Sequence, residues 1–145
     1  MQKDILIKIQ GSQNIGAQNV DSVELTTTGT IEFLEEGCKI LYEESELTGM
    51  QGTTTSIIVE KIGKVTLNRT GTTNSCLVFE EGQKHLSYYD VGDGAFSIAV
   101  YTEYLEVDIN KLGGEIEIEY VIEIDNKVMG SNTIRLDFEY PNGGY

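Results

Sequence analysis

The chain has 145 residues, 39% of them apolar, so it can bury one sizeable core and is too short for two domains of ordinary size. Ten Lys and Arg residues against 24 Asp and Glu residues give a net charge of −14. This balance argues against a nucleic-acid or anionic-membrane surface, because such a surface needs clustered lysine and arginine. We expect a single domain over residues 1–145, with a flexible tail at 141–145.

Glycine-containing turns separate stretches rich in Val, Ile, Thr and Tyr, a pattern typical of an all-β chain. Alternation of apolar and polar residues predicts eight strands, at 3–11, 21–34, 38–46, 53–61, 64–70, 75–81, 84–90 and 95–108. A long hairpin follows, in which 115–124 and 133–140 flank a turn from Asp125 to Gly130. Ten consecutive strands without crossover helices favour a single antiparallel up-and-down β-barrel that closes on itself. A β-sandwich is the main alternative.

Two stretches also fit a helical period, at 40–47 and 99–112. In the second stretch, however, Val100, Thr102 and Tyr104 alternate in one parity, and Leu105, Val107 and Ile109 in the other. A change of parity inside one apolar strand indicates a β-bulge, so we expect one long bulged strand there.

The start of the chain lacks the apolar core of a signal peptide, and no apolar run approaches the length of a membrane span. We therefore expect a cytoplasmic protein. In that compartment Cys38 and Cys76 stay reduced, and two cysteines with a single histidine cannot supply four zinc ligands. The sequence thus predicts no metal site and no cofactor.

Short motifs in a fixed order run from about residue 5 to residue 140. They are Thr27-Thr28-Gly29, Tyr42-Glu43-Glu44, Gly49, Arg69-x-Gly71, Phe79 to Gly82, Tyr88, Gly94, Thr102, Gly114 to Tyr120 and Asn132-Thr133-Ile134. The set resembles the YwiB-like family of bacterial proteins of unknown function. That resemblance implies a calycin-like (lipocalin-like) β-barrel and brings no established activity.

Polar residues on apolar strand faces are the candidate site. Arg69 shares a face with Val65 and Leu67, which predicts that it points into the barrel. A buried arginine needs a partner, and Glu44 is the one we expect. By the same parity argument three further polar side chains point inward, namely Tyr42, Thr102 and Tyr120. Two interpretations stay open: an internal structural salt bridge, or a ligand site in which Arg69 binds an anionic group and the other side chains orient it.

Catalytic constellations are not supported by the sequence, which leaves enzymatic activity open but unsupported. The best candidate pairs Cys76 with His85, which share a face if Phe79 pairs with Lys84 across the hairpin. The segment Asp90 to Gly94 resembles the start of a calcium-binding loop, but it has glycines where side-chain oxygen ligands are required and lacks the bidentate glutamate. A hairpin turn is therefore expected there.

The leading functional hypothesis is a barrel that holds a small anionic molecule near Arg69. The alternative is a barrel filled by its own side chains, which acts as a structural or protein-interaction module through its acidic outer face, from Glu115 to Glu123. The partners to consider are therefore a small anion, a second copy of the chain in a homo-oligomer, or a basic protein.

Overall fold

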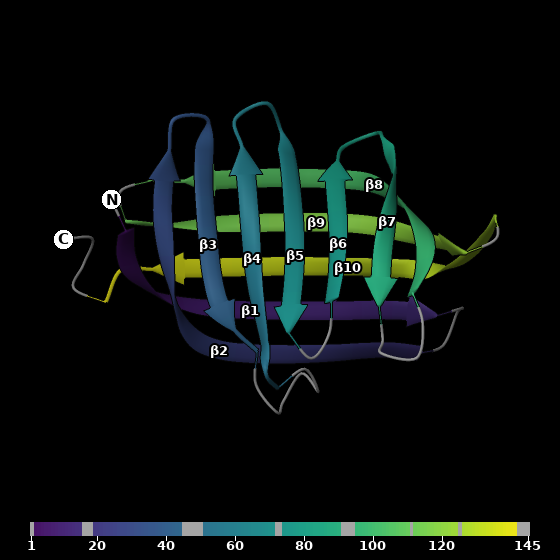
Figure 1. Ribbon diagram of the computed structural model, residues 1–145, viewed down its shortest axis with the longest axis horizontal. Coiled ribbons are helices and arrows are strands. Elements are labelled where there is room, and N and C mark those ends of the chain that lie inside the picture. The colour runs from purple at the N-terminus through teal and green to yellow at the C-terminus, as the bar shows by residue number, and fades with distance from the viewer. Residues whose placement is uncertain are drawn as a thin grey trace.

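A computed structural model describes residues 2–15, 19–44, 51–71, 74–90, 95–110, 112–124 and 126–141, and the side chains among them except at 13–15, 19–21, 88–90 and 95–96. These residues form ten β-strands (Figure 1). The strands are β1 (Gln2–Ile15), β2 (Asn19–Leu34), β3 (Gly37–Glu43), β4 (Thr53–Glu60), β5 (Lys64–Gly71), β6 (Asn74–Glu80), β7 (Lys84–Asp90), β8 (Ala95–Ile109), β9 (Gly113–Ile124) and β10 (Lys127–Glu139).

The ten strands close into one antiparallel barrel. Each strand pairs with its neighbours in sequence, and β1 also pairs with β10, which joins the two ends of the sheet. The expected up-and-down barrel is confirmed, and the sandwich and helical alternatives are wrong. The physical reason is that pairing the first strand with the last leaves neither terminal strand at a free edge of the sheet, as a sandwich would.

The barrel is flattened into two layers whose strands cross (Figure 1). β3 to β6 run up and down in the front layer, and β1, β9 and β10 run across behind them. β2 and β8 pass from one layer to the other at opposite corners. β2 pairs with β1 over residues 19–32 but with β3 only over 29–34. β8 pairs with β7 over 95–101 and with β9 over 99–109.

The bulge expected in the long strand β8 is confirmed. Its register against β9 shifts between Thr102 and Tyr104. The shift comes earlier than the pattern indicated, so Tyr104 does not share the inner face of Val100 and Thr102 but lies opposite the exposed Glu119. Val100 and Thr102 are buried before the shift, and Leu105 packs against the core after it. The extra residue thus keeps an apolar face inward as the strand turns the corner.

The turn before β10 is shorter than predicted. Lys127 already pairs with Ile124, and the irregularity moves into β10, between Val128 and Gly130. Asn126 adopts a positive φ of 64°, which asparagine tolerates better than most residues. A tight turn followed by a bulge therefore replaces the six-residue turn expected from the sequence.

The core lies between the two layers and is built from alternate residues of the strands. Its fully buried members include Ile7, Ile40, Val65, Phe79 and Leu136. The ring of Phe79, from the front layer, lies 4.8 Å from that of Tyr120 in β9, centroid to centroid, in a tilted arrangement. This contact joins the two layers.

Some predictions fall outside the described residues: 91–94 of the expected hairpin turn, 45–46 of the third strand, Asp125, and 142–145 of the expected tail. In the described part of the chain, no helix is long and apolar enough to cross a bilayer.

Candidate functional site

A row of polar side chains crosses the inner face of the front layer. Tyr42 of β3 lies opposite Thr55 of β4, Thr55 opposite Arg69 of β5, and Arg69 opposite Ser75 of β6. Glu44 follows two residues after Tyr42 and points to the same side. We call these five residues the Arg69 cluster. It lies near the lower edge of the front layer in Figure 1, where β3 and β5 end and β4 and β6 begin.

The carboxylate of Glu44 is held firmly inside the barrel. Its side chain is 1% exposed, and its Oε2 accepts a hydrogen bond from the hydroxyl of Thr55. The backbone N–H of Glu44 donates to the carbonyl oxygen of Thr53 at 2.8 Å, which extends the pairing of β3 with β4 by one step. The position of the acid is therefore fixed by both its side chain and its main chain.

Arg69 balances the charge of Glu44 without hydrogen-bonding to it. Its Nε lies 3.7 Å from Oε2 of Glu44, outside the range of about 2.7–3.2 Å for such a hydrogen bond. The expected pairing of the two residues is thus present as an ion pair. The Arg69 side chain is 17% exposed, while its Nε is buried.

Tyr42 remains a neutral phenol in this setting. Burial raises the pKa of its hydroxyl, the negative charge of Glu44 raises it further, and the charge of Arg69 opposes the change. A hydrogen bond from the Tyr42 hydroxyl to the carboxylate of Glu44 also raises this pKa, so the single donor of the phenol is used inside the cluster.

Three buried polar atoms on this inner surface have no hydrogen-bond partner among the described residues. They are Nε of Arg69, Oγ of Ser75 and Oγ of Ser87. A buried donor left without an acceptor costs about 1–3 kcal/mol. Ser75 lies directly opposite Arg69, so two of the three atoms belong to neighbouring positions in the row. The surface is therefore short of acceptors.

Thr102 and Tyr120 point inward as predicted but lie elsewhere in the barrel. They are opposite each other across β8 and β9, and Tyr120 packs on Phe79. The hydroxyl of Thr102 accepts a hydrogen bond from the backbone N–H of Glu80 at 3.2 Å. Glu80 is five residues from Ser75 along β6, or about 17 Å in an extended strand. The structure thus brings together Tyr42, Glu44 and Arg69, but not these two.

The sequence interpretation missed the three hydroxyls that complete this surface: Thr55, Ser75 and Ser87. Thr55 shares strand parity with the buried Ile57 and Val59, and Ser75 with the buried Leu77 and Phe79, whereas β7 gives no such signal for Ser87. The parity rule that identified Arg69 could therefore have found Thr55 and Ser75 too.

Cys76 and His85 do not share a face, so the proposed pair is wrong. Cys76 pairs with Tyr88 rather than with residue 87, one step from the predicted register. His85 lies opposite the buried Val100, on the inner face, whereas the inner positions of β6 on either side of Cys76 are Ser75 and Leu77. A shift by one residue moves a side chain to the other face of a sheet. Both cysteines are free, and burial raises the pKa of Cys38 to about 11.

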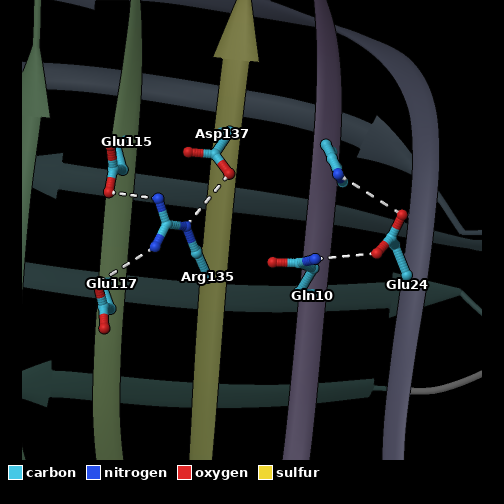
Figure 2. Close-up of polar contacts among 7 residues, drawn as sticks. Gln10, Glu24, Glu115, Glu117, Arg135 and Asp137 are labelled. Atoms are coloured by element: carbon cyan, nitrogen blue, oxygen red, sulfur yellow. Dashed lines mark hydrogen bonds and ion pairs between the residues drawn. The ribbon is translucent and has the colours of Figure 1, made fainter.

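The outer face carries its own charge network, centred on Arg135 of β10. Its guanidinium lies 2.9 Å from Glu115, 3.9 Å from Glu117 and 3.4 Å from Asp137 (Figure 2). Among the residues with described positions, no group of three or more His, Cys, Asp or Glu side chains could hold a metal ion.

Comparison with known proteins gives a family and a fold. The family model described as "Domain of unknown function (DUF1934)" matches residues 7–136. The crystal structure of the ywiB protein from Bacillus subtilis has a similar fold, with a TM-score of 0.84 and 18% sequence identity, over 96% of this chain and 92% of that one. At this identity the likeness shows the fold alone. No curated protein matches the chain. The resemblance drawn from the sequence motifs is confirmed.

Proposed function

The chain belongs to the DUF1934 family, a domain of unknown function, and from the geometry of its barrel we propose that it binds a small anionic molecule at the Arg69 cluster. The observation that carries this proposal is the shortage of acceptors on the inner surface, where Arg69 and Ser75 each present a buried atom without a hydrogen-bond partner among the described residues. Carboxylate or phosphate oxygens are acceptors that would relieve it.

Arginine suits such a ligand because its planar guanidinium offers five N–H donors in a fixed fork. The contact with Glu44 uses charge and leaves Nε–H without a hydrogen bond, so that donor is available to a ligand oxygen. Partial exposure of the Arg69 side chain gives an approach from the end of the barrel.

Glu44 limits the charge of the ligand. Its carboxylate already balances Arg69, so each further negative charge on the ligand is repelled by Glu44 at close range. The hydroxyl of Ser75, which has no partner among the described residues, can donate to the ligand and offset part of this cost. We therefore expect a singly charged group, a carboxylate or a phosphate monoanion, in preference to a dianion.

The number of strands and the state of the two cysteines also bear on the proposal. Barrels of eight strands hold one small ligand in lipocalins, and the interior widens with strand number, which supports a ligand-binding role for this ten-stranded barrel. We place the protein in the cytoplasm. The support is that Cys38 and Cys76 are both unpaired, as is usual where thiols stay reduced.

Native mass spectrometry of protein purified from its own host tests the proposal. Wild type is expected to carry a small anionic adduct that Arg69→Met lacks. Arg135→Met is a matched control, because Arg135 is the only other arginine of the chain and lies in the outer charge network. Glu44→Gln is expected to retain the adduct more tightly, since the repelling charge is gone.

Three results would contradict the proposal. An adduct that survives in Arg69→Met would place the ligand elsewhere. Equal loss in the Arg135→Met control would show a nonspecific effect of charge. An empty wild-type protein that also fails to bind acetate or inorganic phosphate in titrations would leave Arg69 and Glu44 as a structural ion pair.

A further inference from the structure

The second half of β8 has an edge without a strand partner among the described residues. Pairing with β7 ends at Tyr101, whereas pairing with β9 continues to Ile109. Beyond that point the edge meets the β6–β7 connection, where the backbone N–H of Leu105 donates to Oε1 of Glu81 at 3.1 Å. Val107 and Ile109 follow at the same parity, so their N–H and C=O groups point to this same edge.

A groove runs along this open edge. It has a volume of about 690 Å³, within the range of ligand pockets. One side is lined by Leu105, Val107 and Ile109 of β8, and the other by apolar side chains that include Phe33 and Ile62. The distance from residue 105 to residue 109 is about 13 Å in an extended strand, room for an added segment of about five residues.

The outer face beside the groove is acidic and incompletely neutralised. Glu106 and Asp108 lie directly opposite Glu117 and Glu115 of β9, and like charges in such positions repel. Arg135 of β10 neutralises the two acids of β9 from the far side (Figure 2). For Glu106 and Asp108, no cation of the described chain lies within ion-pair distance. The strand position next to β8 is therefore suited to basic side chains.

We propose that an extended segment of a partner protein, in which basic and apolar residues alternate, adds to the β8 edge as a further strand. Its backbone bonds to Val107 and Ile109, its apolar side chains enter the groove, and its basic side chains lie beside Glu106 and Asp108. A second copy of this chain is disfavoured because it would bring the same two acids against each other on a chain with a charge of −14. The proposal is independent of the Arg69 cluster.

Binding of a labelled synthetic peptide in which lysine and valine alternate tests this, with a glutamate–valine peptide as control. Val107→Pro removes the N–H that faces the open edge and spares the pairing with β9. It is expected to weaken binding about tenfold or more, whereas Val107→Ala keeps the N–H and binds within about threefold of wild type.

A charge exchange keeps the test decisive if the proline variant fails to fold. Glu106→Lys/Asp108→Lys is expected to lose the lysine–valine peptide and to gain the glutamate–valine peptide. The proposal is overturned if wild type does not bind the lysine–valine peptide, or if Val107→Pro folds and binds it unchanged. It is also overturned if the charge exchange does not change which peptide is preferred. Sedimentation that finds wild type as a dimer and Val107→Pro as a monomer would assign the β8 edge to a second copy of the chain and overturn it as well.

Discussion

Replacing Arg69 by methionine keeps an unbranched stem and removes the charge that balances Glu44. The two groups are 3.7 Å apart, and the acid is 1% exposed. At this distance two unit charges interact by about 4 kcal/mol when the effective dielectric constant is about 20. Partial exposure of Arg69 lets water screen part of this interaction. We therefore expect Arg69→Met to lower the free energy of unfolding by about 2–3 kcal/mol.

A second substitution separates the lost charge from the lost packing. Glu44→Gln removes the negative charge and keeps an oxygen that can accept the hydroxyl hydrogen bond of Thr55. Adding it to Arg69→Met should therefore restore about 1–2 kcal/mol. Guanidinium unfolding followed by circular dichroism measures both, since the chain has no tryptophan. A loss below about 0.5 kcal/mol in Arg69→Met, or no recovery in the double variant, would refute the reasoning.

Packing and burial elsewhere in the barrel give three further expectations. A Cβ on Gly29 would overlap a backbone oxygen of β3 and lie 2.7 Å from a methyl group, so Gly29→Ala should cost about 1–3 kcal/mol. The Cβ of Gly11→Ala meets nothing nearer than 4.0 Å, so this variant should have the melting temperature of wild type. The expectation is contradicted if Gly29→Ala and Gly11→Ala have the same melting temperature. Because burial raises the pKa of Cys38 to about 11, a thiol reagent at mild pH should modify Cys76 well before Cys38, measured in the two single-cysteine variants; equal rates would disprove it. The folded-state pKa values of Cys38 and Tyr42 lie above their ordinary values of 9.0 and 10.0, so the unfolded chain releases these protons first. The contribution of these two groups to stability should be constant below pH 9.0 and fall as the pH rises beyond it, and an unchanged denaturation midpoint there would count against the raised values.

Strand parity is the part of the fold that the sequence predicts best. Alternation has a period of two, so a few neighbouring residues decide which side chains point inward. Arg69, Glu44 and Tyr42 were placed on the inner face in this way, and the change of parity in β8 predicted its bulge, although Tyr104 lies after the register shift and not before it. Closure of the barrel followed from the number of strands and the absence of helices between them.

Pairing between strands is where prediction from sequence fails, because register depends on every residue of a connection. The turn before β7 closes as expected, with the N–H of Gln83 donating to the carbonyl of Glu80 at 2.9 Å. Cys76 nevertheless pairs with Tyr88, one residue further along β7 than that turn alone would give. Parity also cannot say how far apart two inward residues lie along the barrel, so Thr102 was grouped with Arg69 although β6 separates them.

The Nε–H signal of Arg69 in a nitrogen–proton NMR spectrum tests the central claim most directly. Only two arginines contribute such signals, and Arg135→Lys assigns them. Titration with acetate and with inorganic phosphate is predicted to shift the Arg69 signal saturably, because this N–H has no hydrogen-bond partner among the described residues, and to leave the signal of Arg135 almost unchanged. An Arg69 signal that does not move, or that moves together with that of Arg135, would contradict an anion site inside the barrel.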